Sequence, residues 1–149
     1  MRILVLEDHP DTAQLLARVL THAGYDVETA QTVAEARRAC AGAAIDLLVA
    51  DIVLGDGDGW ELMEDLVSEH DQRGVSVSAL PNHEAEARSR EVGYTFHLTK
   101  PLEISALLRA VRATLAGSRN PPRDGQSNRV AAEPATTHRL KAPRRGEVR

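Results

Sequence analysis

Apolar and amphipathic segments alternate along residues 1–116, and each apolar segment ends in polar residues. The apolar segments are short and rich in branched side chains, so they predict strands at 2–6, 25–30, 45–51, 75–78 and 94–99. The segments between them carry apolar residues at helical spacing and predict helices at 11–23, 32–41, 60–70, 84–92 and 102–116. Strands that alternate with helices through short loops are typical of a parallel sheet covered on both faces.

The predicted fold class is therefore α/β, a doubly wound five-stranded parallel sheet with helices on both faces. Segment 25–30 alternates apolar and polar residues, which is typical of an edge strand, whereas 45–51 is almost continuously apolar. Local signals agree with these boundaries. Gly24 is a stop signal after the first helix, and Thr32 with Glu35 predicts a capping box at the start of the second.

Charge is distributed unevenly along the 149 residues. The net charge of the chain is −4, but residues 1–116 carry −9 and residues 117–149 carry +5. An acidic body argues against direct binding of nucleic acid by that body. Residues 117–149 contain four prolines and few large apolar side chains, so we expect a basic, Pro-rich, disordered tail with no room for an output domain.

Composition also bears on the compartment. No run of 18 apolar residues predicts a membrane span, and the N-terminus shows no signal-peptide pattern. The single cysteine, Cys40, excludes an internal disulfide framework and is consistent with a reducing cytosol. We therefore expect a cytoplasmic protein.

Polar residues follow the predicted strands at their carboxyl ends. Glu7 and Asp8 follow the first strand, Asp51 ends the third, Ser78 ends the fourth and Lys100 follows the fifth. In open parallel sheets this edge is where ligands bind. The sequence thus predicts one site that holds three carboxylates, a hydroxyl and an ammonium.

Three carboxylates in one pocket repel one another unless a cation is present. Carboxylate oxygens in a partly hydrated site suit Mg²⁺ (or Mn²⁺), which would explain the adjacent acids Glu7 and Asp8. Lys100 and Ser78 could then contact a bound anion. Carboxylates, Mg²⁺, lysine and hydroxyl are together the groups that stabilise a transferring phosphoryl group.

Four motifs in order carry a resemblance to a known family. They are "ILVLEDHP", "LLVADIVLGDGDGWEL" around Asp51, "VSA" at the end of the fourth strand, and "GYTFHLTKP". On these motifs, residues 2 to about 115 resemble the receiver domain of two-component response regulators, with the chemotaxis-type single-domain regulators as the most similar architecture. The resemblance implies a flavodoxin-like (βα)5 fold with strand order 2-1-3-4-5.

The resemblance also implies a role for each matching residue at the acidic pocket. Asp51 would accept a phosphoryl group from a histidine kinase or a histidine phosphotransfer protein. Asp8 and Asp51 would bind Mg²⁺ directly, Glu7 through water, and Val53 through its backbone carbonyl. Lys100 would contact a phosphoryl oxygen.

A second set of implied roles concerns signalling. Ser78 would be the switch hydroxyl that moves toward the phosphate, and Ala79 would offer its backbone N–H. His97 stands where the family usually has Tyr or Phe as the switch aromatic. A downstream effector protein would read the surface of the fourth helix, fifth strand and fifth helix. By the same analogy, the peptide bond between Lys100 and Pro101 is expected to be cis.

Two alternatives from other functional classes stay open at this point. The chain could be an interaction module whose basic tail, rather than its body, binds nucleic acid or acidic partners. It could also be an aspartate-nucleophile phosphohydrolase, but that chemistry usually needs a second acid two residues after the nucleophile, and this position is Val53. The leading prediction is a non-enzymatic phosphoacceptor that catalyses only its own phosphorylation and dephosphorylation.

Overall fold

The computed structural model describes residues 1–80 and 83–117, so the predicted tail from residue 118 onward lies outside the described residues. The strands are β1 (Arg2–Leu6), β2 (Asp26–Ala30), β3 (Leu47–Asp51), β4 (Val53–Leu54), β5 (Gly57–Asp58), β6 (Gly74–Ser78) and β7 (Phe96–Thr99). The helices are α1 (Pro10–His22), α2 (Val33–Gly42), α3 (Gly59–His70), α4 (His83–Val92) and α5 (Ile104–Leu115). All ten predicted elements are present, with ends that differ by a few residues.

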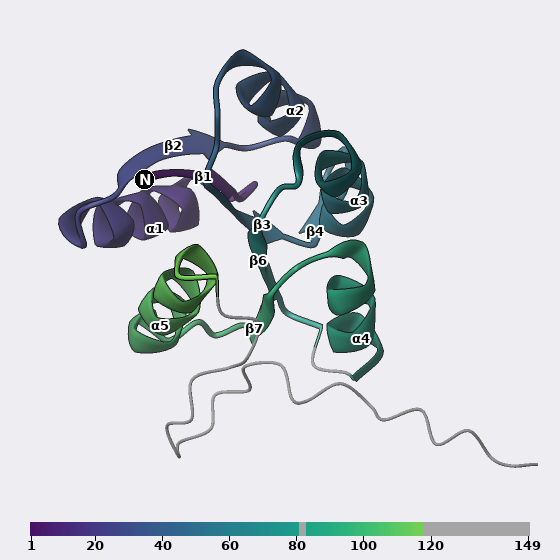
Figure 1. Ribbon diagram of the computed structural model, residues 1–149. Coiled ribbons are helices and arrows are strands. Elements are labelled where there is room, and N and C mark those ends of the chain that lie inside the picture. Colours follow the sequence, from purple (N-terminus) through teal and green to yellow (C-terminus); the bar gives the residue numbers. More distant parts are fainter. Residues whose placement is uncertain (81–82, 118–149) are drawn as a thin grey trace, which may run out of the picture.

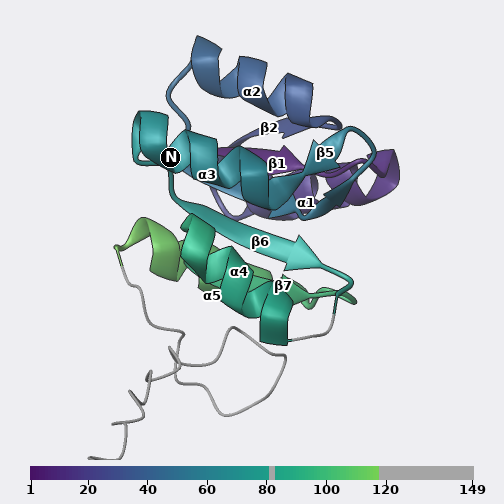
Figure 2. The same ribbon diagram turned by 90° about the vertical axis from the view of Figure 1, so that its right-hand side faces the viewer.

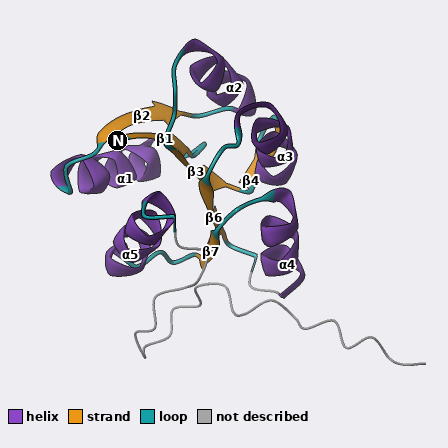
Figure 3. Cartoon of the chain, viewed as in Figure 1, coloured by secondary structure: helices purple, strands orange, loops and turns teal. Residues whose placement is uncertain are grey.

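Five strands form one parallel sheet in the order β2-β1-β3-β6-β7. This confirms the predicted fold class and strand order, since the fourth and fifth strands of the prediction are β6 and β7. The edge position predicted for residues 25–30 is also confirmed, because β2 pairs only with β1 in this sheet. Figure 3 shows the helices on both sides of these strands.

Each face of the sheet packs against its own hydrophobic core. Helices α1 and α5 cover one face, and α2, α3 and α4 cover the other (Figure 1). Alternate residues of β1 point to opposite cores, so Ile3 and Val5 pack with α1 and α5 while Leu4 and Leu6 pack on the other side. This two-sided burial explains why the central strands are continuously apolar. It also leaves the strand ends as the place where polar groups can gather.

The helix start at residue 32 follows the predicted capping signal in part. Thr32 is the N-cap of α2, and its hydroxyl accepts a hydrogen bond from the backbone N–H of Glu35 at 3.1 Å. The reciprocal half of the capping box differs from the prediction. The Glu35 carboxylate accepts from the N–H of Gln31, one residue before the cap, at 2.8 Å. Two orphan N–H groups at this helix entry are still satisfied.

Two features of the structure correct the sequence-based picture. The segment between Asp51 and α3, for which no strand was predicted, contains the antiparallel hairpin β4–β5. Tyr94, expected at the start of the fifth strand, precedes β7 and lies buried with its hydroxyl donating to the carbonyl of Gly59 at 2.6 Å.

The expected cis peptide between Lys100 and Pro101 is present. Within the described residues, no helix has the length and hydropathy needed to span a bilayer.

Candidate functional site

The carboxyl edge of the sheet brings Glu7, Asp51 and Lys100 together. Leu6 of β1 pairs with Ala50 of β3, so the residues that follow them, Glu7 and Asp51, lie side by side at the strand ends. The ammonium of Lys100 lies 2.8 Å from Oδ2 of Asp51 and 3.0 Å from Oε2 of Glu7. Figure 2 shows β5 and the arrowhead of β6 at the same end of the sheet. The predicted convergence of these residues is therefore observed.

Backbone hydrogen bonds hold the residues around Asp51 in place. The second oxygen of Asp51, Oδ1, accepts from the N–H of Val53 at 3.1 Å. The N–H of Lys100 donates to the carbonyl of Ser78 at 2.8 Å, which ties the end of β7 to the end of β6. These bonds mean that the ammonium and the carboxylate approach each other from two fixed strand ends.

A close contact at Gly59 sets the position of α3 relative to Asp51. A Cβ added at Gly59 would lie 2.6 Å from the backbone carbonyl oxygen of Asp51, so only glycine permits this approach. The N–H of Gly59 also donates to the carbonyl of Ile52 at 2.9 Å. Helix α3 thus begins directly against the loop that follows the candidate phosphoacceptor.

The charges at this edge balance one another only in part. Burial by itself lowers the pKa of Lys100, but the hydrogen bonds to Asp51 and Glu7 outweigh that effect and raise the pKa above its ordinary value. Lys100 is therefore an ammonium at neutral pH. Its single positive charge offsets the charge of only one of the two carboxylates that it contacts. Both carboxylates are buried, with Glu7 2% exposed and Asp51 8% exposed.

Asp8 is the more accessible acid of the site. Burial opposes its ionisation, but the hydrogen bond and charge of His9 outweigh this, and the pKa of Asp8 is lowered from its ordinary value. One ligand atom each from Glu7, Asp8 and His9 lies within 4.8 Å of the others. Three carboxylates and one ammonium leave two negative charges at formal ionisation, which matches a divalent cation. The donor set of carboxylate oxygens fits Mg²⁺.

The predicted signalling residues are placed at and beside this edge. Ser78 is fully buried, and its hydroxyl accepts from the N–H of Leu80 at 3.0 Å. Ala79 is exposed directly after the strand. The side chains of Val53, on β4, and Leu80, two residues after β6, are also exposed, at 59% and 36%.

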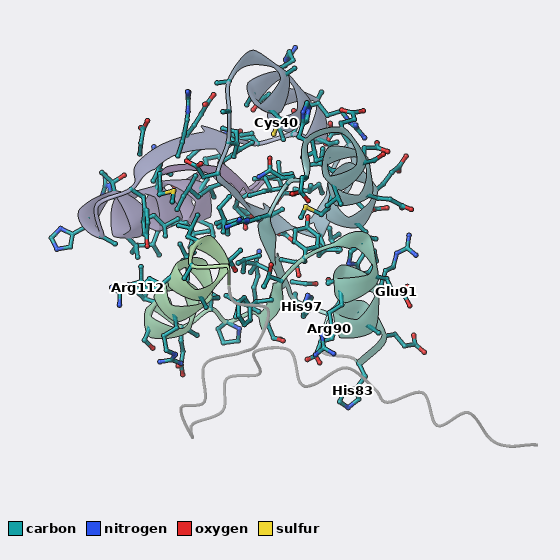
Figure 4. All side chains as sticks on the ribbon, in the orientation of Figure 1. Cys40, His83, Arg90, Glu91, His97 and Arg112 are labelled. Atoms are coloured by element: carbon teal, nitrogen blue, oxygen red, sulfur yellow. The ribbon has the colours of Figure 1, made fainter. Side chains whose placement is uncertain are left out.

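His97 is completely buried and hydrogen-bonded. Its Nδ1 lies 2.7 Å from the hydroxyl oxygen of Ser76 and 3.0 Å from that of Ser89. Figure 4 shows His97 between the sheet and α4. The side chain that stands at the expected switch position is therefore turned inward in this structure.

Sequence reasoning missed the partners of His97. No role was predicted for Ser89 or Trp60, yet the indole Nε1 of Trp60 donates to the Ser89 hydroxyl at 2.9 Å. A signal was present in the helical spacing, because Ser89 falls on the stripe of buried α4 residues that also contains Ala85 and Val92. A polar residue on a buried stripe needs a hydrogen-bond partner. Its identity depends on the tertiary structure.

Comparison with known proteins identifies the family. The family model described as "Response regulator receiver domain" matches residues 3–112, well over half of the chain. The chain therefore belongs to the response regulator receiver domain family, as its motifs indicated.

Similar proteins agree with this assignment. The chain is 28% identical over 148 residues to the transcriptional activator protein IrlR of Burkholderia pseudomallei, covering 99% of this chain and 64% of IrlR. It is 33% identical over 118 residues to the probable transcriptional regulatory protein SilR of Salmonella typhimurium, covering 77% of this chain and 51% of SilR. The chain thus matches only part of the length of these relatives.

Solved structures share the fold. The CheY-like receiver domain protein from Methanospirillum hungatei JF-1 superposes with a TM-score of 0.74 at 26% identity, over 78% of this chain and 94% of that one. The non-phosphorylated HemR receiver domain from Leptospira biflexa gives a TM-score of 0.72 at 29% identity, over 77% and 94%. The likeness therefore covers more than three quarters of this chain and nearly all of each solved receiver domain.

Proposed function

We propose that this receiver domain accepts a phosphoryl group on Asp51 from a histidine kinase or a histidine phosphotransfer protein. The observation that carries the proposal is the position of Asp51, a buried carboxylate at the carboxyl edge of the sheet with Lys100 2.8 Å away. A carboxylate oxygen of Asp51 attacks phosphorus, the bond between phosphorus and the donor imidazole nitrogen breaks, and an acyl phosphate forms. The donor histidine leaves as neutral imidazole after taking up a proton.

The reaction brings an anion into an acidic pocket, so positive charge is needed there. Lys100 is already in hydrogen-bond range of Asp51 and can move from the carboxylate to an incoming phosphoryl oxygen. Its bond to Glu7 keeps the ammonium in the pocket while it changes partner. The backbone N–H of Ala79 is our candidate for a second donor to the phosphoryl group, and the Ser78 hydroxyl for a third.

Glu7, Asp8, Asp51 and the carbonyl of Val53 are the groups that would hold Mg²⁺ or Mn²⁺ in this proposal. A divalent cation bound there would screen the negative charge of phosphoryl donor and acceptor. Asp8 is the best placed for direct contact because its carboxylate is partly exposed and free of Lys100. Glu7 is bound to Lys100 and to the N–H of His9, which suits an outer role through water.

Signalling in this proposal follows from the added charge. A phosphoryl group adds about −1.5 to −2 charges at Asp51 and draws the hydroxyl of Ser78 toward it. Because Ser78 and Lys100 are joined through the backbone, movement at one strand end is passed to β7 and to the surface formed with α4 and α5. A downstream effector protein would read that surface.

The test is direct labelling of the full chain. With Mg²⁺ and radiolabelled acetyl phosphate, the wild type should form an acid-stable, hydroxylamine-sensitive acyl phosphate, and Asp51→Asn should not. Asp26→Asn, an exposed aspartate on the distant edge strand β2, is the matched control and should label like the wild type. Equal labelling of Asp51→Asn and wild type would refute the proposal.

The two alternatives gain no support from the described residues. The position two residues after Asp51 is Val53, whose exposed side chain offers no acid or base for a phosphohydrolase. Binding through the basic tail concerns residues outside the described part of the chain. Deleting residues 118–149 and measuring nucleic-acid affinity of both forms tests that alternative separately.

A further inference from the structure

Four polar side chains form a cluster that crosses the α4-covered face of the sheet. The serine–histidine cluster (Trp60, Ser76, Ser89 and His97) joins α3, β6, α4 and β7. Besides the contacts of Nδ1 with both serines, the Ser76 hydroxyl lies 3.1 Å from the Ser89 hydroxyl and 3.3 Å from the carbonyl oxygen of Phe96. Both serines and His97 have no exposed surface. The hydrogen-bond donors of this cluster must therefore find their acceptors among protein groups and not in water.

The second ring nitrogen of His97 is the decisive feature. Nε2 is buried and has no hydrogen-bond partner within the described part of the chain. A neutral imidazole carries one proton, on either Nδ1 or Nε2. A proton on Nε2 would be a buried donor without an acceptor, which is rarer in proteins than a buried acceptor without a donor.

A proton on Nδ1 satisfies every donor of the cluster. We assign Nδ1–H as the donor to the Ser76 oxygen and the Ser76 hydroxyl as the donor to the Phe96 carbonyl. The contact between the two serine oxygens, in which either hydroxyl can donate, is then made by the proton of Ser89. The Trp60 indole, which can only donate, uses an acceptor position on Ser89. Each oxygen then accepts no more than two hydrogen bonds. Among the described residues, only the lone pair of Nε2 is then left without a partner.

We propose that Ser76 and Ser89 act as positioning residues that hold His97 inward in the unphosphorylated protein, with its ring proton on Nδ1. The bulk of an aromatic ring alone does not impose this arrangement, since the hydroxyls of Ser76 on β6 and Ser89 on α4 both meet Nδ1 of the imidazole, and the Trp60 indole in turn holds Ser89. The statement about switching rests on the proposed function, whereas the tautomer does not. The His97 ring is then already inward before phosphorylation, which we call presetting, and an effector meets the same inward side chain before and after phosphorylation.

Imidazole NMR of the full chain tests the proposal without any variant. Histidine is labelled with ¹⁵N, and two-bond correlations report which ring nitrogen is protonated and how fast its proton exchanges with water. The exposed His22 and His70 provide reference patterns in the same spectrum. We expect the Nδ1–H pattern for His97 with slow exchange. An Nε2–H pattern, or exchange as fast as that of the references, would overturn the proposal.

Variants then test the two serines. Ser76→Ala removes the oxygen that accepts from Nδ1–H and should weaken or abolish the Nδ1–H pattern of His97, Ser76→Thr should restore it, and Ser105→Ala, an exposed serine on α5, should leave it unchanged. An unchanged pattern in folded Ser76→Ala would remove Ser76 from the positioning role. Ser89→Ala removes the second oxygen near Nδ1 and should speed exchange of the Nδ1 proton with water, and exchange as slow as in the wild type would remove Ser89 from that role.

Beryllofluoride with Mg²⁺, a phosphoryl mimic, separates this inference from the proposed function. We expect amide shifts around Asp51 with little change at His97. A His97 ring that passes from exposed to buried on addition would overturn presetting. The absence of any spectral change would overturn Asp51 as the acceptor while the tautomer of His97 still stands on its own pattern.

Discussion

Lys100 and Asp51, 49 positions apart in the chain, are joined by a hydrogen bond of 2.8 Å between an ammonium and a carboxylate that is almost buried. The same ammonium also binds Glu7. In the proposed function this lysine has two tasks, since it stabilises the acidic pocket at rest and receives the phosphoryl oxygen during transfer. The two tasks can be separated by substitution.

Replacing Lys100 with Met should slow phosphorylation of Asp51 by about 10²–10³-fold, the loss typical of removing one charged group that stabilises a transition state. The rate of labelling by acetyl phosphate measures this. The same substitution leaves Glu7 buried without its cation, so the free energy of unfolding should fall by about 1–3 kcal/mol, discounted because the ammonium is partly solvated. Lys100→Arg keeps the charge and should retain most of the stability. Labelling of Lys100→Met at the wild-type rate would contradict the assigned role.

Truncating Ser89 should destabilise the fold without touching the acidic pocket. Ser89→Ala removes the acceptor of the Trp60 indole and one partner of His97, and buried groups left unpaired cost about 1–3 kcal/mol. Urea denaturation of wild type and variant measures the difference. Ser105→Ala on the exposed face of α5 should change stability by less than about 0.5 kcal/mol. Equal stabilities of Ser89→Ala and Ser105→Ala would mean that the cluster contributes little.

Stability should fall at mildly acidic pH because of His97. Burial lowers the pKa of His97 from the ordinary 6.5, and of the charged groups of α4 that act on it, Glu86 opposes the shift while Arg90 adds to it. The unfolded chain therefore binds a proton before the folded protein does as pH falls. Stability is fully present above the unfolded pKa and declines as pH drops below about 6.5, until the folded pKa is passed.

Denaturation at several pH values between about 7.5 and 5 measures this decline. His97→Asn, which cannot titrate, should show a shallower decline than wild type. His22→Asn removes an exposed histidine instead and should follow the wild-type curve. If His97→Asn and wild type lose stability in parallel, His97 does not set the pH dependence.

The apolar side chains beside Asp51 should prolong the phosphorylated state. Val53 on β4 and Leu80 after β6 are exposed apolar side chains, and they offer no group that could orient an attacking water molecule. Val53→Asn together with Leu80→Glu supplies such groups. We expect the acyl phosphate of the double variant to decay faster than that of the wild type, measured by loss of label after removal of the donor. An unchanged lifetime would show that these two positions do not control dephosphorylation.

Sequence periodicity determined the ten elements and the fold class, because local patterns of apolar and polar residues indicate which strands are buried and where they end. The strand ends in turn gave the edge of the sheet at which Glu7, Asp51, Ser78 and Lys100 meet. The capping contacts were predicted less reliably, because two backbone N–H groups can compete for one carboxylate. The Glu35 carboxylate accepts from the N–H of Gln31 and not from that of Thr32. The hairpin β4–β5 also went unpredicted, since two-residue strands have too few residues for a periodic signal.

Only the tertiary structure decided how His97 is held. Its partners Ser76 and Ser89 lie on different elements, and nothing in the spacing of three polar residues says that their side chains share one proton network. The same holds for Lys100, whose two carboxylate partners come from other strand ends. Patterns along a chain record which residues are buried, but hydrogen bonds between distant segments depend on distances of a few ångströms, which arise only when the helices and strands pack.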